Sequence, residues 1–451
     1  MKEGITILGA GESGTGAAIL AKRKGYAVFV SDGGKIKDKY KTELVSEAIE
    51  FEEGCHTEEK ILDTNIIIKS PGIPDNAEII VKAKAKSIEV IDEVEFAFRN
   101  TTGQIIAITG TNGKTTTTLL TYHLLKTAGF HVALVGNVGY SFAREVAREN
   151  YDWYVLEVSS FQLDGTTMFN PAIGILLNIT PDHLDRYEYS MDKYADSKFR
   201  LINNMTNDRY FIYYMDDSVI ADKVAKQNVT PRQIKISLTS SQKADVHFDN
   251  DAMNFSLSDE QFKFSQSETT LVGPHNLINT MAAVSATYLA GVSLESIREG
   301  LKSFRNAPHR LESVGVIRGV EFVNDSKATN VDSVVYALGS YDRPLIWIAG
   351  GIDKGNDYSK IEEQVKQKVK ALICLGKDND KLKKAFKDIV ATIRETQDVK
   401  DLVRIAMEQA ESGDVVLLSP ACASFDLFRN YEDRGDQFRE AVKKLKEEID
   451  Q

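Results

Sequence analysis

The sequence predicts an α/β protein with three domains, each built on a mostly parallel sheet. Three observations support this prediction. Short apolar runs alternate with amphipathic stretches almost throughout the chain, which is the pattern of strand–helix–strand units. Two glycine-rich loops each lie between an apolar run and a helical pattern. The length of 451 residues suits about three domains of ordinary size.

The first series of elements predicts a Rossmann-like domain over residues 1–95. Strand, helix, strand and strand are expected in that order at Ile5–Leu8, Ser13–Lys24, Ala27–Ser31 and Asn65–Lys69. The last strand should end at Ser70-Pro71-Gly72, because proline and glycine favour a turn. A glycine loop joins the first strand to the helix, as in nucleotide-binding βαβ units.

The second series predicts a central, P-loop ATPase-like domain over residues 96–304. Its parallel strands are expected at Gln104–Thr109, Val132–Val135, Trp153–Val158 and Ala172–Asn178. Ile234–Phe264 differs, because its short runs alternate with period two and are separated by polar turns such as Asp249-Asn250-Asp251. We therefore expect a small antiparallel patch there beside a mostly parallel sheet.

The third series predicts a Rossmann-like C-terminal domain over residues 305–451. Val314–Asn324, broken at Arg318-Gly319, is expected to form a hairpin that opens this domain. Buried strands are expected at Leu345–Ala349, Ala371–Cys374 and Asp414–Leu418. The lysine-rich region Lys360–Lys387 is interpreted as a solvated helical surface.

Composition argues against several classes of protein. The formal net charge of −11 argues against a general nucleic-acid binder, which needs a concentrated basic surface. Apolar runs such as Ala172–Leu177 are far shorter than the roughly 18 residues of a membrane span, so we expect no membrane insertion. Met1-Lys2-Glu3-Gly4 leads directly into a strand without a signal peptide, and the three cysteines lie far apart. A reduced cytoplasmic protein without disulfides or a zinc site is the simplest interpretation.

The first glycine loop, Gly9-Ala10-Gly11-Glu12-Ser13-Gly14, has the pattern G-x-G-x-x-G. This pattern usually indicates a nicotinamide or flavin cofactor, and Asp32 stands about where a ribose-binding acid is expected. A lone match carries a high false-positive risk, and the same physics serves any nucleotide or pyrophosphate. A plain glycine turn also stays open.

The second loop, Gly110–Thr116, reads G-T-N-G-K-T-T and lies between a strand and an apolar helical stretch. Its G-K-T ending belongs to a P-loop, in which Lys114 reaches the β/γ-phosphates and Thr115 holds Mg²⁺. A strict P-loop has glycine where Ile108 stands, so this loop is a shorter variant. One chain rarely needs both ATP and a hydride carrier, so an ATP loop argues against a dehydrogenase. The alternative is a glycine turn without nucleotide.

Two motifs near this loop offer metal ligands or bases. Glu157 ends a strand, where a carboxylate beside a P-loop commonly positions Mg²⁺, although a structural role fits equally well. His183, in Asp182-His-Leu-Asp-Arg186, follows the next strand and could be a metal ligand, a base or a structural histidine. Lys198 lies on an amphipathic stretch and, from spacing alone, is an ordinary surface lysine.

Together the motifs resemble one family over essentially the whole chain: the ATP-dependent amide ligases of peptidoglycan assembly and their folylpolyglutamate synthetase relatives. The ATP loop Gly110–Thr116 is shared by that family. Further segments resemble the branch that adds D-glutamate to UDP-N-acetylmuramoyl-L-alanine, namely Glu157–Leu163, Asp182–Tyr187, Asn324–Asn330 and Leu418–Ser424. The resemblance implies that ATP converts a carboxylate to an acyl phosphate, that an amine attacks it to give a tetrahedral intermediate, and that phosphate then leaves.

The resemblance also implies ATP and Mg²⁺ as cofactors. The catalytic residues would be Lys114, Glu157, His183 and Lys198, the last carbamylated by CO₂. The metal ligands would be Thr115, Glu157, His183 and the carbamylated Lys198. The ATP site would comprise Gly110, Thr111, Asn112, Gly113, Lys114, Thr115, Thr116, Asn276, Asn279, Arg310 and Asp325.

Two substrate sites follow from the same resemblance. UDP-N-acetylmuramoyl-L-alanine would contact Ser13, Gly14, Thr15, Asp32, Ser70, Gly72, Asn137 and His183, so the first glycine loop would hold its uridine diphosphate. D-Glutamate has two carboxylates that need donors and positive charge, and it would contact Lys327, Thr329, Lys354, Ser424 and Phe425. No nucleic-acid partner is implied, and we expect a cytoplasmic monomer.

Structural alternatives stay open for several of these residues. Asn276 and Asn279 could cap a helix, and Arg310 could form a surface ion pair. Asp325 or Ser326 could cap the helix that follows, and Ser424 could be an ordinary loop residue. For the whole chain, the alternatives are a sibling ligase with another amino acid, a glutamate ligase acting on folate, and a nucleotide-sensing or dehydrogenase protein built on the first loop.

Overall fold

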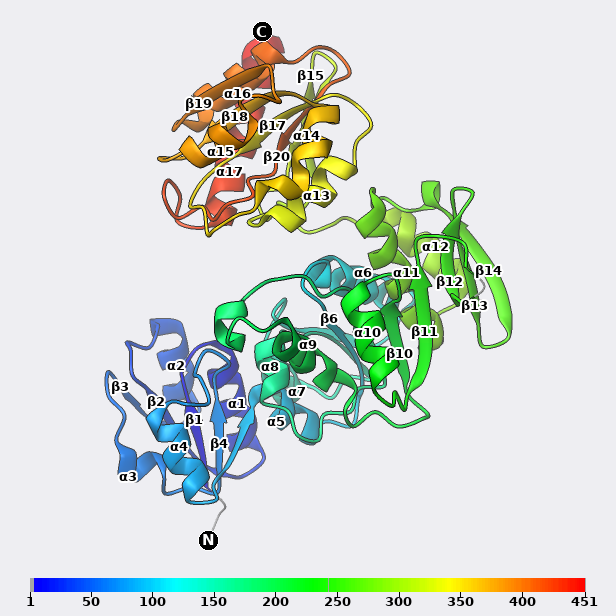
Figure 1. The fold of residues 1–451 in the computed structure, drawn as a ribbon. Coiled ribbons are helices and arrows are strands. Elements are labelled where there is room, and N and C mark those ends of the chain that lie inside the picture. The colour runs from blue at the N-terminus through cyan, green and yellow to red at the C-terminus, as the bar shows by residue number, and fades with distance from the viewer. Residues whose placement is uncertain (1–3, 242, 451) are drawn as a thin grey trace. The chain divides into compact units, whose positions relative to one another are not determined.

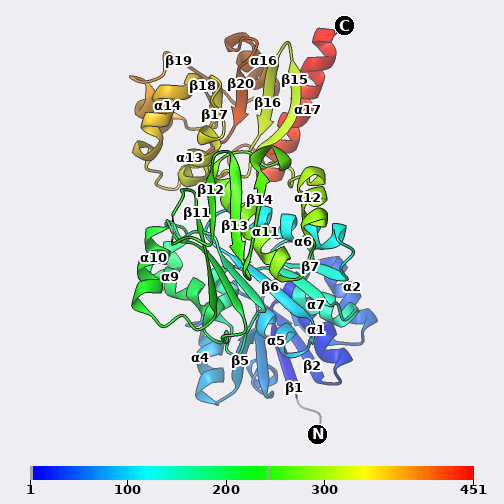
Figure 2. The same ribbon diagram turned by 90° about the vertical axis from the view of Figure 1, so that its right-hand side faces the viewer.

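The computed structural model describes residues 4–241 and 243–450, which form three sheets in two compact units (Figures 1 and 2). Unit 1 runs to Thr270 and includes Ile278–Phe304, and it holds the first two sheets. Unit 2 comprises Leu271–Leu277 and the chain from Arg305 onward, and it holds the third. The α/β class and the three sheets confirm the predicted fold, whereas the domain boundaries at 95/96 and 304/305 stay predictions.

The first sheet has the strand order β3-β2-β1-β4-β5, and every pair in it is parallel. Its strands are β1 (Gly4–Leu8), β2 (Ala27–Asp32), β3 (Glu50–Glu53), β4 (Ile66–Lys69) and β5 (Glu89–Asp92). The helices are α1 (Glu12–Arg23), α2 (Asp38–Ser46), α3 (Glu58–Ile61), α4 (Glu78–Ala85) and α5 (Glu93–Arg99). Ile7 and Leu8 belong to different apolar clusters, because successive side chains point to opposite faces and both faces are covered.

The second sheet has nine strands in the order β14-β13-β12-β11-β10-β9-β6-β8-β7. The strands are β6 (Gln104–Thr109), β7 (Val132–Gly136), β8 (Trp153–Glu157), β9 (Ile173–Leu176), β10 (Tyr210–Tyr214), β11 (Arg232–Ser237), β12 (Val246–Asp249), β13 (Ala252–Leu257) and β14 (Glu260–Ser265). The helices are α6 (Lys114–Thr127), α7 (Phe142–Arg148), α8 (Ser160–Asp164), α9 (Met191–Phe199), α10 (Ser218–Lys226), α11 (Pro274–Leu289) and α12 (Leu294–Ser303). Short 3₁₀ turns are η1 (Leu184–Tyr187), η2 (Arg200–Ile202) and η3 (Gln266–Glu268).

The antiparallel patch predicted over Ile234–Phe264 is partly wrong. Only β12, β13 and β14 pair antiparallel, whereas β11 is parallel to both β10 and β12. Period-two alternation reports which side chains share a face, and it says nothing about strand direction. The tight turn at Asn250 and Asp251, both with left-handed φ angles of 49° and 57°, forces the antiparallel return from β12 to β13.

The third sheet has the order β15-β16-β20-β17-β18-β19 and is parallel except for its first pair. The strands are β15 (Glu312–Ile317), β16 (Val320–Asn324), β17 (Leu345–Ala349), β18 (Val369–Leu375), β19 (Thr392–Thr396) and β20 (Val415–Leu418). The helices are α13 (Val331–Gly339), α14 (Glu362–Lys368), α15 (Asp380–Phe386), α16 (Val399–Gln409) and α17 (Tyr431–Asp450), with the 3₁₀ turn η4 at Tyr358–Ile361. The hairpin of β15 and β16 turns at Arg318-Gly319, which confirms that prediction.

The interpretation of Lys360–Lys387 as one helical surface is wrong in its middle part. The buried strand β18 lies between α14 and α15, and the chain from Ala371 to Leu375 is almost fully buried. The strand expected at Ala371–Cys374 is thus confirmed within β18, and the helical interpretation applies only to the lysine-rich segments on either side of it. Among the described residues, no helix is long and apolar enough to cross a membrane.

Candidate active site

The loop between β6 and α6 lies at the carboxyl end of a strand with neighbours on both sides, β8 and β9. Gly110 and Gly113 have positive φ angles of 153° and 86°, which side chains rarely adopt. A Cβ atom at Gly113 would also overlap the side-chain oxygen of Asn279. The loop ends at the N-terminus of α6, where backbone N–H groups favour a bound anion. This geometry supports the predicted phosphate cradle.

Two lysines converge on this loop. Lys114 donates from Nζ to the carbonyl oxygens of Gly110 and Thr111, both at 2.8 Å. Lys198 donates to the same Gly110 oxygen at 2.9 Å, and its ammonium lies 4.6 Å from the ring centroid of Tyr194. Lys198 is only 1% exposed, so the interpretation of an ordinary surface lysine is wrong. The buried face of α9, which carries Tyr194 and Lys198, packs on the loop, and sequence spacing alone does not reveal this contact.

Burial lowers the pKa of Lys198 well below that of an ordinary lysine, and the positive charge of Lys114 lowers it further. Both causes disfavour the ammonium form. A neutral amine is the form that reacts as a nucleophile, so this site is suited to a lysine that becomes chemically modified.

The loop is tethered by side chains that sequence reasoning missed. The hydroxyl of Thr111 donates to Thr180 O at 3.1 Å and lies 3.2 Å from the hydroxyl of Tyr194. Asn178 accepts from Asn112 N–H at 2.8 Å and donates back to Asn112 O at 3.0 Å. Asn178 and Thr180 lie two and four residues after the end of β9, and their place at the carboxyl end of the predicted strand Ala172–Asn178 was the available signal.

Glu157 ends β8 beside the loop, since it pairs in register with Ile108 of β6. It is 5% exposed, and its Oε2 has no hydrogen-bond partner among the described residues. A buried carboxylate oxygen of this kind fits a hard cation such as Mg²⁺. Among the described residues, no group of three or more acidic, histidine or cysteine side chains gathers as a ready-made metal site. Asn137 is exposed, and its backbone N–H donates to Glu157 O at 3.1 Å.

His183 has a left-handed φ of 50°, a conformation that is uncommon for residues other than glycine. Its side chain is 58% exposed, with Nε2 3.6 Å from Asp182 Oδ2 and the ring 5.2 Å from that of Phe161. The guanidinium carbon of Arg186 lies 4.1 Å from the ring centroid of Phe161, and its Nη2 donates to Pro71 O. The His183 segment therefore contacts the loop after β4, which contains the candidate residues Ser70 and Gly72.

The first glycine loop packs closely on its neighbours. A Cβ at Gly14 would overlap Gly9 O, and one at Gly9 would overlap the Ser70 hydroxyl. Asp32 accepts from Ala10 N–H at 2.7 Å and from Gly34 N–H at 2.8 Å, so it also holds two loops in place. Of the candidates on α1, Gly14 and Thr15 are buried and Ser13 is partly exposed, which leaves the backbone and Ser13 to face a ligand.

Unit 2 holds its own group of candidate residues. Asp325 is 8% exposed, accepts from the Ser419 hydroxyl at 2.9 Å, and has its pKa raised by burial to about 7. Lys327 lies 3.9 Å from the ring centroid of Tyr431. The other candidates differ in accessibility: Ser424 is buried, Thr329 and Arg310 are partly exposed, and Lys354 and Phe425 are exposed.

Arg434 is a residue of this unit that sequence reasoning missed. It is 2% exposed and donates to the hydroxyl and carbonyl of Ser326, to Gly350 O and to Cys422 O. These acceptors belong to the three loops that carry Lys327, Lys354 and Ser424. Burial lowers the pKa of Arg434 to about 10, and the side chain connects all three loops from α17.

Two structural alternatives are wrong. Asn276 and Asn279 lie inside α11, so neither caps it, and Asn276 donates from its side chain to Val272 O at 2.9 Å. The cap of α13 is Asn330, which accepts from Ser333 N–H at 2.8 Å, and not Asp325 or Ser326. Both alternatives depended on the residue at which a helix begins, and helix boundaries are difficult to locate from sequence.

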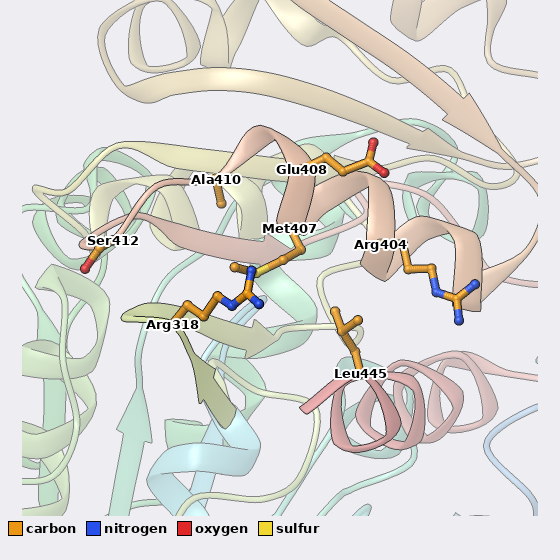
Figure 3. A pocket seen from close by; sticks show the side chains of 7 residues that line it. All are labelled: Arg318, Arg404, Met407, Glu408, Ala410, Ser412 and Leu445. Atoms are coloured by element: carbon orange, nitrogen blue, oxygen red, sulfur yellow. The ribbon is translucent and has the colours of Figure 1, made fainter. Parts of the chain in front are cut away.

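A cavity of about 530 Å³ in unit 2 lies apart from these candidates (Figure 3). Met407 of α16 and Leu445 of α17 form its apolar lining, and the Arg318 side chain from the β15–β16 turn reaches toward Met407. The other lining residues are Arg404, Glu408, Ala410 and Ser412. No predicted site residue is among them.

Comparisons with known proteins agree along the whole chain. Three family models match: the MurD N-terminal domain over residues 4–79, the Mur ligase middle domain over 108–287 and the Mur ligase glutamate ligase domain over 309–422. The UDP-N-acetylmuramoylalanine–D-glutamate ligase of Cytophaga hutchinsonii is 51% identical over 448 residues, which cover 99% of this chain and 100% of that protein. The ligase of the same name from Bacteroides thetaiotaomicron is 48% identical over 442 residues, with 98% and 99% covered.

Solved structures show the same fold. A pseudomurein peptide ligase type C from Methanothermus fervidus has a TM-score of 0.63 at 20% identity, covering 98% of this chain and 100% of that one. A MurF ligase from Thermotoga maritima in complex with ADP has a TM-score of 0.61 at 16% identity, with 93% and 96% covered.

Proposed function

Because the chain belongs to the UDP-N-acetylmuramoylalanine–D-glutamate ligase family, we propose that it joins D-glutamate to UDP-N-acetylmuramoyl-L-alanine with ATP. The reaction forms an amide bond and releases ADP and phosphate. It would supply a cytoplasmic step of peptidoglycan synthesis, carried out by a monomer. The arrangement that best supports this chemistry is the gathering of Lys114, Lys198 and Glu157 at one glycine loop.

The γ-phosphoryl group of ATP would be transferred to the alanyl carboxylate of the UDP-linked substrate. Both groups are anions, so positive charge must lie between them. We propose that Gly110–Thr116 holds the phosphates, that Lys114 turns from the loop carbonyls to the β/γ oxygens, and that Asn276, Asn279, Arg310 and Asp325 complete the ATP site. The acyl phosphate that results is activated for attack by the amine of D-glutamate.

Mg²⁺, when bound, would screen the phosphate charges, and the residues at this loop fit it. The unpartnered oxygen of Glu157 is the protein ligand best supported by the structure, with Thr115 and His183 as further ligands. Lys198 would react as the neutral amine: its nitrogen forms a bond to the carbon of CO₂, and a proton leaves to solvent. The carbamate would add an anionic oxygen to the ligands.

The substrates would take separate sites. We propose that the domain over residues 1–95 holds the uridine diphosphate through Ser13, Gly14, Thr15, Asp32, Ser70 and Gly72, and that Asn137 and His183, in the domain over 96–304, contact the muramoyl-alanine end. The domain over 305–451 would hold D-glutamate through Lys327, Thr329, Lys354, Ser424 and Phe425, where ammonium groups and donors match its two carboxylates.

A substrate-pair assay tests this function. Phosphate should be released from ATP only when UDP-N-acetylmuramoyl-L-alanine and D-glutamate are both present. Equal turnover with L-glutamate, or none with D-glutamate, would contradict the proposal, and a screen of other amino acids and of folate acceptors would then identify a sibling activity. Lys114→Ala should abolish turnover without loss of the fold.

A further inference from the structure

His56 forms an ordered cluster with Ser31 and Glu52 at the end of the first sheet. Ser31 is the last residue but one of β2 and is fully buried, and its hydroxyl lies 2.7 Å from Glu52 Oε1 and 2.6 Å from His56 Nδ1. Glu52 also accepts from Thr57 N–H at 2.8 Å. The imidazole itself is exposed, so a buried hydroxyl holds the ring at the surface in one orientation.

The hydrogen bonds of this cluster fix the tautomer of His56. Burial raises the pKa of Glu52, but hydrogen bonds from Thr57 and Ser31 outweigh it and keep the pKa below the usual range, so the group is a carboxylate that only accepts. Ser31 has one proton, which it donates to Glu52. The Ser31 oxygen must then accept from His56 Nδ1–H. In the neutral ring, Nε2 is left as a hydrogen-bond acceptor on an exposed side chain.

The Nε2 nitrogen lies beside an exposed pair of glycines. A Cβ atom at Gly33 would be 3.0 Å from His56 Nε2, so any larger residue there would press on the ring. Gly54 N–H donates to Asp32 O at 2.9 Å and to Gly34 O at 3.0 Å, which fixes the loop after β3 against the loop after β2. Gly33 and Gly34 therefore offer exposed backbone without side chains, and the His56 acceptor lies beside Gly33.

A nucleotide placed on this sheet would reach that surface with its base. In folds of this type the pyrophosphate lies at the glycine loop after β1 and the ribose at the acid that ends β2. The base continues past the ribose, away from the pyrophosphate. Asp32 is that acid here, and the next loop in the order β1, β2, β3 carries His56.

We infer that His56 is a specificity residue for the nucleobase, and that its Nε2 accepts a hydrogen bond from the imide N3–H of uracil. The inference rests on the proposed function, in which the substrate contains a uridine nucleotide. It adds a residue that recognises the uracil base of that nucleotide. Uracil presents a donor at N3, whereas cytosine presents an acceptor there. A fixed acceptor that meets another acceptor is left unsatisfied, so it discriminates between the two bases.

The test measures the dissociation constants of UDP, CDP and N3-methyl-UDP with the full-length protein by calorimetry. His56→Phe keeps a flat ring of similar size without the acceptor, and His56→Ala removes the ring. The control is His131→Ala, an exposed histidine of the same unit that pairs with Glu149 at 3.1 Å. The wild-type protein and the control should bind UDP about tenfold tighter than CDP or N3-methyl-UDP, as one well-made hydrogen bond allows.

Both His56 variants should reduce these preferences to within about twofold, mainly through weaker UDP binding. A His56→Phe variant that keeps the full preference would overturn the inference, since stacking would then suffice. So would a wild-type protein that fails to discriminate or to bind UDP. The substrate-pair assay separates the outcomes: amide formation with D-glutamate and an unchanged base preference would refute the role of His56 alone.

Discussion

Lys114 and Lys198 donate to the same carbonyl oxygen, that of Gly110, at 2.8 and 2.9 Å. Two ammonium groups on one acceptor repel each other, and the cost is larger because Lys198 is buried. The arrangement is relieved when a phosphate draws Lys114 away or when Lys198 loses its charge. The two positive charges at the loop therefore favour a bound anion. The lowered pKa of Lys198 favours its neutral form, which also relieves the repulsion.

The role of Lys198 can be tested by replacement and rescue. Lys198→Ala should lower kcat by at least about a hundredfold, the size expected when one electrostatic group of an active site is lost. Formate or acetate should restore part of the activity, because a short carboxylate can take the place of a carbamate. The measurement is the rate of phosphate release against carboxylate concentration.

Lys193 provides the matched control for that experiment. It lies on the same helix, but its side chain is half-exposed and paired with Glu188. Lys193→Ala should keep wild-type kcat and respond little to formate. A Lys198→Ala variant with unchanged activity, or one that no carboxylate rescues, would show that the buried amine has only a packing role.

Alanine substitutions of Gly113 and Gly129, which lie at opposite ends of the same helix, test the packing of the phosphate loop. Both flank α6 and have left-handed φ angles, 86° and 83°, but only Gly113 would bring a Cβ onto Asn279. Gly129→Ala should cost about 1 kcal/mol of unfolding free energy with normal turnover. Gly113→Ala should cost about 2–4 kcal/mol and raise the KM for ATP. Urea unfolding and steady-state kinetics measure both effects, and equal effects of the two substitutions would contradict the tight packing.

The sequence predicted the strands and loops of this site better than the surroundings of its side chains. The strands that end at Leu8 and Thr109 could be located because apolar runs stop at glycine, and the strand predicted to end at Val158 ends one residue earlier, at Glu157. The burial of Lys198 could not be predicted, since it depends on how α9 packs against a loop 88 residues away. Local periodicity carries no record of such long-range contacts.

The same limit explains the missed residues Arg434 and His56. Arg434 lies in a helix rich in charged residues, where one buried arginine resembles its exposed neighbours. His56 gains its orientation from Ser31, which is adjacent only because β2 and β3 pair. A motif scan finds residues that lie close in sequence, whereas these contacts arise from the order of strands in a sheet.

Two buried acids at the start of α5 should make stability depend on pH. Burial raises the pKa of Asp92 to about 7 and that of Glu93 to about 8. In the unfolded chain such groups titrate near pH 4, so between about pH 4 and 8 the folded state binds more protons. Unfolding free energy should therefore fall as pH rises through this range.

Glu93→Gln should flatten this profile, because an amide keeps its hydrogens at every pH. At pH 8 the variant should be more stable than the wild-type protein by on the order of 2 kcal/mol, with little difference at pH 5. Urea unfolding at several pH values measures this. Glu95→Gln is the control: Glu95 is equally buried but accepts from Arg99 and from backbone N–H groups, so its loss should destabilise the protein. A steeper profile for Glu93→Gln would contradict the assignment.

Arg434 should act on D-glutamate binding through the loops that it connects. Arg434→Met keeps most of the packing but removes the donors to Ser326, Gly350 and Cys422, so the loops should lose their fixed spacing. We expect a KM for D-glutamate at least about tenfold higher and an unfolding free energy about 2 kcal/mol lower.

A purely structural role of Arg434 would leave the KM for D-glutamate unchanged, so this KM separates a structural role from a positioning role. The KM for UDP-N-acetylmuramoyl-L-alanine should stay near the wild-type value, because its proposed site lies in unit 1. Arg439→Ala serves as the control, since Arg439 lies on the same helix and pairs with Glu312 at 2.9 Å. If Arg434→Met lowers stability but leaves the KM for D-glutamate unchanged, Arg434 supports the fold and does not position the amino-acid site.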